Sequence, residues 1–262
     1  MLSLIANKGL GDALYLRALT LRYLEDGEDR INVFTFWPNA FFGLPDCVEI
    51  KNPVTMRPDE PGLKYLAYCI TCPFPEGHSR AYSQFAMATR RLGFDDVDLK
   101  LGWTIQNVEL VKMVHAKAAG RPIMLYQPLK QMDHPEARLL RPLDDDFERY
   151  LKRNSNYFRI RIGHPNYLSM KRKRRGDYDL DLIGCPISDV FDLAMISTRI
   201  FCEPCFLVVL AEATDTEFTC LFSRRAQRER FSIAYNVKPA RIFYKPHLAT
   251  VLYDEEAALV DA

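Results

Sequence analysis

The sequence predicts an α/β protein in which helices cover parallel sheets on both faces. Three observations support this class. Short apolar runs rich in β-branched and aromatic residues alternate with stretches whose apolar residues recur at helical spacing. The chain opens with a strand, a loop, a helix and a second strand, the unit from which parallel sheets are built. The break Gly120-Arg121-Pro122 separates two halves that both show this alternation.

The first half begins with a short apolar strand over residues 2–6, which stops at Asn7-Lys8-Gly9. Apolar residues at helical spacing then predict a helix from Asp12 to about Glu25, and residues 31–36 read as the second strand. The remaining elements predicted for this half are strands at 47–50 and 65–71 and helices at 80–92 and 106–119.

The second half repeats the pattern. Its predicted strands are 123–126, 158–162, 180–183, 199–202 and 218–222, and its predicted helices are 143–154, 189–196 and 206–213. Ser188 is expected to cap the helix at 189–196. We place the domain boundary at the Gly120 break, which gives domains 1–120 and 121–262, with the option that the last segment crosses back.

Composition excludes several classes of protein. Of 262 residues, 48% are hydrophobic and 26% are charged, which argues against disorder or a fibrous repeat. Lys and Arg number 35 and Asp and Glu 34, so a nucleic-acid role would need a local basic patch. No apolar run approaches the roughly 20 residues of a membrane span, and residues 1–12 lack a signal-peptide cleavage site. We therefore expect a cytoplasmic protein with free thiols and no membrane insertion; oligomeric state is not predicted.

The loop Lys8-Gly9-Leu10-Gly11-Asp12 lies between the first strand and the first helix, where open α/β sheets bind ligands. Gly9 and Gly11 permit close approach of the backbone to an anionic group. The loop matches neither G-x-G-x-x-G nor Walker A, which disfavours dinucleotide binding and nucleotide hydrolysis. Asp12 is a candidate general base. The alternative is that Asp12 only complements the dipole of the helix.

Residues 7–14, Asn-Lys-Gly-Leu-Gly-Asp-Ala-Leu, resemble the opening of the family nine glycosyltransferases, the heptosyltransferase group. Residues 187–196 and 198–205 are similar to the donor-binding region of that family, with Glu203-Pro204-Cys205 where the family has an acidic-Thr-Gly turn. The resemblance implies a GT-B fold, with two Rossmann-like domains facing each other across a cleft. It also implies an inverting, metal-independent glycosyltransferase whose only cofactor-like molecule is the nucleotide-sugar co-substrate.

The resemblance assigns roles to particular residues. Asp12 would be the catalytic base, and Glu203 would bind the donor. Lys130 matches a basic side chain that contacts the donor phosphates in the family; its alternative is a solvated loop lysine. From their positions after predicted strands or in the first loop, Gly11 and His164 are further candidates for donor binding.

A run of five cations, Lys171-Arg172-Lys173-Arg174-Arg175, is the strongest local charge anomaly. Adjacent cations repel one another, and binding a polyanion would relieve that repulsion. Candidates are the donor diphosphate, a phosphorylated glycan acceptor or a DNA backbone. The alternative is a solvated loop.

Two C-x-x-C pairs are present, Cys69/Cys72 and Cys202/Cys205, about 130 residues apart. Zinc sites usually draw all four ligands from a compact segment, so we favour buried or near-site thiols over a shared zinc site. The five histidines show no H-x-x-x-H or H-E-x-x-H spacing, which disfavours a zinc hydrolase. No metal site is predicted.

The leading hypothesis is a glycosyltransferase that moves a sugar from a nucleotide-sugar to an acceptor hydroxyl. The acceptor is either a hydroxymethylated base in DNA, as in viral DNA modification, or an anionic glycan. The alternative is a non-catalytic nucleic-acid-binding protein with a degenerate transferase fold, which the altered Glu203-Pro204-Cys205 turn and the short chain favour.

Overall fold

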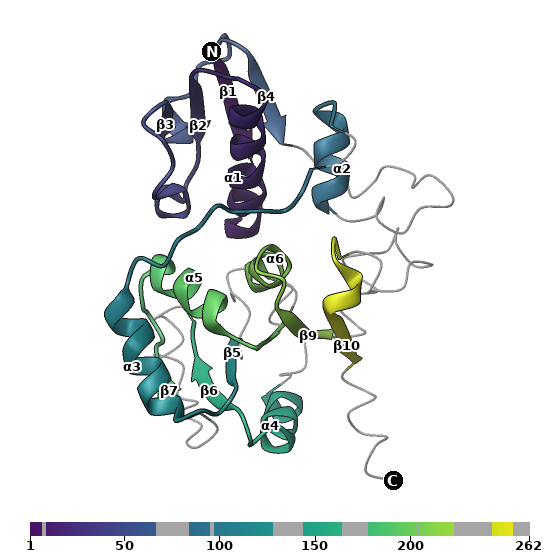
Figure 1. Ribbon diagram of the computed structural model, residues 1–262. Coiled ribbons are helices and arrows are strands. Elements are labelled where there is room, and N and C mark those ends of the chain that lie inside the picture. The colour runs from purple at the N-terminus through teal and green to yellow at the C-terminus, as the bar shows by residue number, and fades with distance from the viewer. Residues whose placement is uncertain are drawn as a thin grey trace. The chain divides into compact units, whose positions relative to one another are not determined.

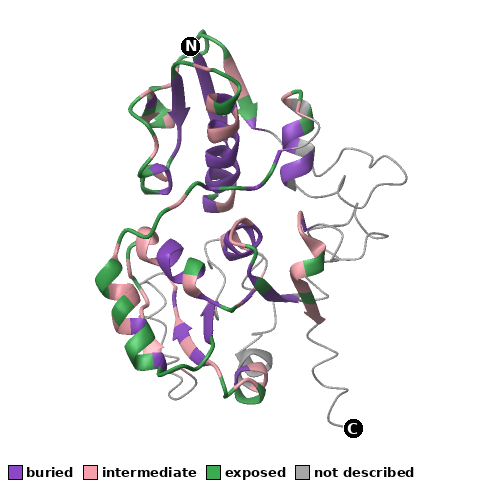
Figure 2. Ribbon diagram, in the orientation of Figure 1, coloured by how far each residue is buried: buried purple, intermediate pink, exposed green. Residues whose placement is uncertain are grey.

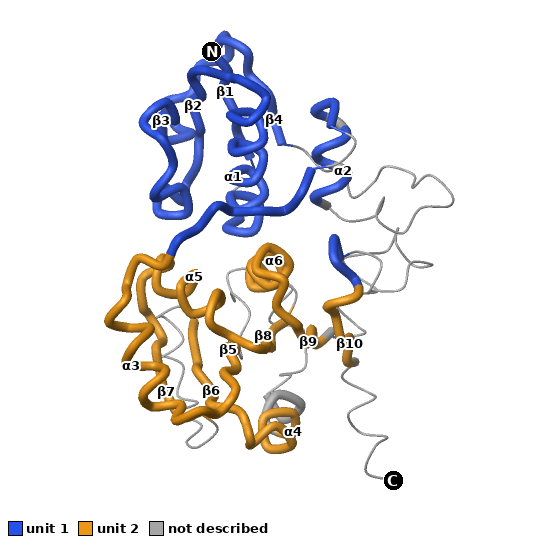
Figure 3. The backbone as a smooth tube through the Cα atoms, viewed as in Figure 1, with its two compact units in different colours: residues 1–104, 238–246 blue, residues 105–237, 247–262 orange. Residues whose placement is uncertain are grey.

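The computed structural model describes residues 1–6, 9–66, 84–94, 97–127, 144–163, 178–203, 205–222 and 243–253. The chain forms two compact units, shown in Figure 3. Unit 1 comprises residues 1–104 and 238–246, and unit 2 comprises residues 105–237 and 247–262. Among the described helices, none has both the length and the apolar character needed to span a membrane.

Unit 1 contains a parallel sheet with the strand order β3-β2-β1-β4. Its elements, in chain order, are β1 (Leu2–Ala6), α1 (Leu10–Glu25), β2 (Ile31–Phe34), η1 (Pro38–Phe41), β3 (Val48–Lys51), η2 (Pro53–Thr55), β4 (Leu63–Leu66) and α2 (Gln84–Arg91). The first strand is therefore flanked by β2 on one side and β4 on the other (Figure 1). The order changes direction at the boundary between β1 and β4.

Helix α1 is buried on nearly all sides (Figure 2). Leu14, Leu16 and Leu19 each expose at most 1% of their surface. Apolar side chains around the whole circumference of a helix are typical of a central helix that packs on several elements. α1 is thus the central helix of unit 1.

Arg17 is a charged residue in this buried helix, and only 1% of it is exposed. Its guanidinium donates hydrogen bonds to the backbone carbonyls of Ala40 (3.1 Å), Phe42 (2.9 Å), Leu101 and Gly102 (3.4 Å). Burial lowers the pKa of Arg17 to about 10, because the charged form has lost its hydration. One side chain on α1 therefore fixes both the turn around η1 and the end of unit 1.

Unit 2 contains a parallel sheet with the strand order β10-β9-β8-β5-β6-β7. Its elements are α3 (Val108–Ala118), β5 (Ile123–Gln127), α4 (Asp144–Arg153), β6 (Phe158–Arg161), β7 (Leu180–Asp181), α5 (Ile187–Ile196), β8 (Arg199–Cys202), α6 (Phe206–Ala213), β9 (Glu217–Phe222), η7 (Pro246–Leu248) and β10 (Ala249–Tyr253). Counted from its own first strand, β5, this is the 3-2-1-4-5-6 order of a Rossmann fold.

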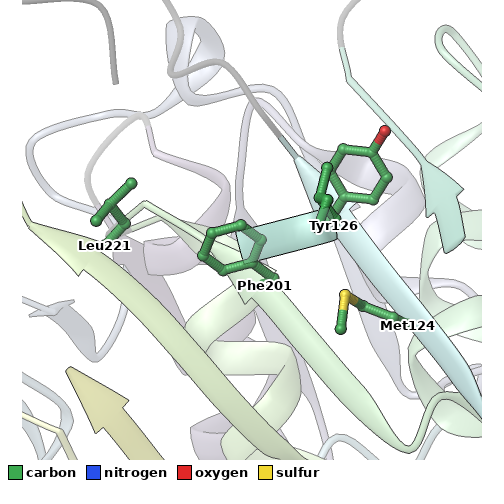
Figure 4. Close-up of a cluster of buried hydrophobic side chains, with 5 residues drawn as sticks. Met124, Tyr126, Phe201 and Leu221 are labelled. Atoms are coloured by element: carbon green, nitrogen blue, oxygen red, sulfur yellow. The ribbon is translucent and has the colours of Figure 1, made fainter. Parts of the chain in front are cut away.

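One core of unit 2 lies between the sheet and α4. Met124 and Tyr126 from β5, Phe201 from β8 and Leu221 from β9 form a buried cluster with Leu151 of α4 (Figure 4). The ring of Tyr150 stacks on Phe201 at 4.0 Å between centroids. The cluster spans three neighbouring strands and therefore sets the spacing of the central strands.

The division between the units differs from the predicted domain boundary. The chain passes from unit 1 to unit 2 between Thr104 and Ile105, so α3 belongs to unit 2, whereas the predicted boundary at residue 120 assigned this helix to the first domain. The physical reason is Asp192 on α5, whose carboxylate accepts hydrogen bonds from the backbone amides of Gln106 and Asn107. This bonding attaches the start of α3 to α5.

Other differences concern the ends of elements. α1 begins at Leu10 rather than Asp12, because Gly9 and Asp12 form its N-terminal cap. Ser188 does not cap α5; the helix starts at Ile187 and Pro186 occupies the N-cap position. The predicted strand at 65–71 is observed as β4, Leu63–Leu66, and its later residues lie outside the described part of the chain. Strand β10 was not predicted.

We predict that replacing Arg17 with Met lowers the free energy of unfolding by about 3 kcal/mol, because buried carbonyls of two segments lose their donor. Urea denaturation measures the change. The control is Arg22→Met on the same helix, where the side chain is 40% exposed and pairs with Asp26. A surface ion pair contributes at most about 1 kcal/mol. Equal losses in the two variants would contradict a clamping role for Arg17.

Candidate functional site

In open parallel sheets, ligands bind outside the carboxyl ends of the strands, at the point where the strand order reverses. In unit 1 this point lies between β1 and β4, and the chain that leaves β1 runs directly into α1. In unit 2 it lies between β5 and β8, whose last residues, Gln127 and Cys202, are register partners. Each unit therefore has one preferred position for a ligand.

In unit 1 this position holds Asp12. The residue lies in the first turn of α1 and is 8% exposed. Its Oδ2 atom accepts a hydrogen bond at 3.2 Å from the backbone N–H of Gly9, the N-cap residue, which is the contact that the third helical residue makes in a capping box. The hydrogen bond orients the carboxylate at the start of the helix, close to the positive end of the helix dipole. The predicted helix-stabilising role of Asp12 is therefore present in the structure.

Gly9 leaves room for this contact. A Cβ atom at position 9 would lie 2.7 Å from Oδ2 of Asp12, closer than such atoms approach. The backbone of Gly9 is extended, with φ of −72° and ψ of 147°, which any residue adopts. A side chain at position 9 would therefore require the Asp12 carboxylate to move, and the spacing of three residues between Gly9 and Asp12 is the signal for this contact. Gly11 is the second residue of α1, so it belongs to the helix and not to the loop in which it was predicted.

In unit 2 the corresponding position holds Glu203, which directly follows β8 and is partly buried. Helix α6 starts immediately afterwards, with Cys205 as its N-cap and no acidic residue in its first turn. The N–H groups of a helix start carry partial positive charge and suit a phosphate. Glu203 and the start of α6 therefore lie together at the ligand position of the unit 2 sheet. Gln127, at the end of β5, is a neighbour that the sequence analysis did not single out.

The C-x-x-C pair at this position belongs to a group of three thiols. Cys202 contacts both Cys205 and Cys220, its register partner on β9. The hydrogen bond with Cys205 lowers the pKa of Cys202, but the contact with Cys220 and burial outweigh it and raise the pKa well above its usual value. The contact with Cys202 and burial likewise raise the pKa of Cys205. Cys202 and Cys205 are therefore protonated at neutral pH.

Several predicted site residues fall outside the described residues. They are Lys130, His164, the five cations Lys171, Arg172, Lys173, Arg174 and Arg175, and the first thiol pair, Cys69 and Cys72. In the described part of the chain, no three His, Cys, Asp or Glu side chains are grouped so as to hold a metal ion. The structure thus describes one predicted residue of each site, Asp12 and Glu203, in addition to Gly11.

Solved structures share the fold of this chain. A family nine glycosyltransferase from Veillonella parvula matches 99% of this chain over 90% of its own length, with a TM-score of 0.56 and 11% identity. The ADP-heptose LPS heptosyltransferase II of E. coli matches 98% of this chain over 94% of its own length, with a TM-score of 0.50 and 12% identity. The chain has the GT-B fold. The predicted fold class is confirmed.

The iron-containing dodecameric glycosyltransferase TibC of E. coli also matches, with a TM-score of 0.50 and 14% identity. The match covers 84% of this chain but only 57% of TibC, so this chain spans little more than half the length of that protein. No family model and no curated protein matches the sequence. At these identities the similarity establishes the fold, and activity has to be argued from the sites.

The contact between Gly9 and Asp12 gives a prediction about stability. Gly9→Ala should lower the free energy of unfolding by about 1 kcal/mol, because the new methyl group displaces the carboxylate and breaks the cap. In an Asp12→Ala background the same change should be neutral or slightly stabilising, since the clash is absent and alanine lowers the entropy of the unfolded chain. Urea denaturation of the four proteins measures this coupling. Identical effects of Gly9→Ala in both backgrounds would contradict the proposed contact.

Proposed function

We propose that the protein is an inverting glycosyltransferase that uses a nucleotide-sugar as donor. The observation that carries the proposal is the placement of Asp12, a buried and oriented carboxylate at the ligand position of the unit 1 sheet. A second Rossmann-like unit supports it, because Glu203 and the start of α6 lie at the ligand position of that sheet. The fold shared with heptosyltransferases agrees with this assignment.

In the proposed reaction, Asp12 accepts the proton of an acceptor hydroxyl while the hydroxyl oxygen attacks the anomeric carbon of the donor. The new bond between carbon and oxygen forms on the face opposite the diphosphate. The bond from the anomeric carbon to the diphosphate oxygen breaks, so the configuration inverts. The proton ends on Asp12 and the electron pair leaves with the nucleoside diphosphate.

The leaving diphosphate gains negative charge in the transition state. The amide groups at the start of α6 are suited to stabilise that charge, because no acidic residue in the first turn opposes them. Glu203 would accept hydrogen bonds from hydroxyl groups of the donor. Lys130 and His164 remain predicted contacts of the donor. The cleft that would bring donor and acceptor together also remains a prediction.

The solved structures of similar fold support a choice of the first donor to test. One of them is named for ADP-heptose, so an adenosine diphosphate sugar is the first donor to test. Metal independence also stays a prediction, and the iron-containing TibC makes a chelator experiment worthwhile. The acceptor is proposed as an anionic glycan or a hydroxymethylated DNA base, with the cations at 171–175 as its expected contact.

A panel of nucleotide-sugars separates an enzyme from a binding protein with a degenerate transferase fold. We expect one donor at 100 times its dissociation constant to stabilise the folded protein by about 2.7 kcal/mol, which thermal unfolding detects. The panel should include ADP-, UDP-, GDP- and CDP-linked sugars, with free sugars as controls. Stabilisation by none of the nucleotide-sugars would exclude the transferase and favour the binding protein.

Asp12→Asn tests the catalytic role directly. We expect turnover to fall by about 10² to 10⁴-fold, because the amide cannot accept the proton, while donor affinity stays the same. Mass spectrometry of the transfer product measures turnover, and calorimetry measures donor binding. Glu25→Gln is the matched control at the other end of α1, where the side chain is 70% exposed. Unchanged turnover in Asp12→Asn would remove Asp12 as the base.

A further inference from the structure

The segment that leaves unit 1 is held by Arg17. The guanidinium donates to the carbonyls of Leu101 and Gly102 and lies 5.2 Å from the ring centroid of Trp103. A planar guanidinium with several donors fixes a backbone segment more precisely than a single hydrogen bond does. The last residues of unit 1 are therefore attached to α1.

The segment that enters unit 2 is held by Asp192, which is fully buried. Its carboxylate lies 2.7 Å from the backbone nitrogen of Asn107, and both oxygens lie 3.1 Å from that of Gln106. Asn107 in turn caps α3, because its Oδ1 accepts from the amide of Leu110 at 3.0 Å. A buried carboxylate needs such donors, since removal from water is costly without them. The first residues of unit 2 are therefore attached to α5.

We propose that Arg17 and Asp192 are positioning residues that anchor the connecting segment from its two ends. The connecting segment is one of the places where the chain crosses from one unit to the other. At this crossing, a change in the relative orientation of the units would take place in the residues between Trp103 and Gln106. The anchors are oppositely charged side chains acting on different groups of the backbone, carbonyls in unit 1 and amides in unit 2.

Each anchor is also connected to the candidate site of its own unit. Arg17 lies on the same continuous helix as Asp12. Asp192 lies on α5, which leads through Ser197 and Thr198 into β8 and so to Glu203. Thr198 is fixed to β5, because both its backbone N–H and its hydroxyl donate to the carbonyl of Ile123 at 2.9 Å. A rotation between the anchors would therefore carry Asp12 and Glu203 with their units.

In the described residues, the chain crosses between the units a second time, between Pro246 and His247, and this crossing is also attached on both sides. Before it, the Tyr244 hydroxyl donates to the carbonyl of Val97 at 2.6 Å and its ring contacts Phe85 at 5.2 Å between centroids, both in unit 1. After it, β10 pairs with β9 along five residues from Ala249 to Tyr253 in unit 2. Both crossings are thus short segments with a firm attachment on either side.

Amide hydrogen exchange of the full chain, without any nucleotide-sugar, tests the anchors. In Asp192→Asn we expect the amides of Gln106 and Asn107 to exchange at least about tenfold faster, while those of β5 and β8 keep their rates. Asp189→Asn is the matched control on the same helix, since Asp189 accepts from the side chain of Asn107, at 3.1 Å. Small-angle X-ray scattering of Asp192→Asn and of Arg17→Lys should differ from that of the parent protein, because a loosened connecting segment changes the distribution of distances between the two units.

Unchanged exchange at residues 106 and 107, or an equal acceleration throughout unit 2, would overturn the proposal. Identical scattering curves for all variants would also overturn it. Any role of the two anchors in catalysis rests on the proposed function. The exchange and scattering measurements do not depend on that function. If the protein transfers no sugar but the amides respond as expected, the transferase assignment fails and the anchors stand.

Discussion

The buried guanidinium of Arg17 organises unit 1. Removing an arginine from water is costly, and here four backbone carbonyls from two separate segments compensate for the lost hydration. The same interaction holds the turn that follows β2 and the segment that leaves the unit. α1 thereby connects three parts of the unit: the Asp12 carboxylate at its start, the η1 turn, and the exit of the chain. The geometry of the candidate site depends on this helix being held in place.

The two parallel sheets explain why one ligand position is expected in each unit, although the sequence motifs at these positions are short. The carboxyl ends of parallel strands meet at one edge, and the loops at that edge lead into helix starts with unpaired N–H groups. In unit 1 the start of α1 is occupied by the chain's own carboxylate, Asp12, which satisfies the amide of Gly9. In unit 2 the first turn of α6 contains no acidic residue. The two helix starts thus differ in charge: one presents a carboxylate suited to accept a proton, and the other suits an anion.

Local patterns predicted most of the described elements. The strand at 199–202 and the helix at 206–213 agree with the structure to the residue, since each is a short apolar segment bounded by polar or turn residues. The predicted domain boundary lies at the Gly120 break, where α3 ends, whereas the two units divide between Thr104 and Ile105. Helix α3 is attached to unit 2 by Asp192, a contact across about 85 residues that no local pattern shows. The start of α5 was missed for a local reason, because Pro186 takes the N-cap position without a side-chain hydrogen bond.

Local sequence patterns also predicted some residues of the candidate sites, whereas residues that depend on strand register were not predicted. The Gly-Leu-Gly-Asp turn identified Asp12 and its place after β1, and alternation of strands and helices placed Glu203 after β8. The third thiol, Cys220, could not be predicted, because its contact with Cys202 depends on the register between β8 and β9. Gln127 was missed similarly, because the reversal of strand order that makes it a site neighbour appears only when all six strands are placed.

The capping contact of Asp12 bears on the choice between a structural and a catalytic carboxylate. The geometry makes the two roles compatible. A general base must hold its oxygen atoms in a defined direction, and a hydrogen bond from the Gly9 amide to Oδ2 supplies that orientation from the backbone itself. Glycine is one of the residues preferred at the N-cap, and here it leaves room for the carboxylate. The contact between Gly9 and Asp12 therefore serves the helix start and orients the carboxylate at the same time, so the capping role does not exclude the proposed catalytic one.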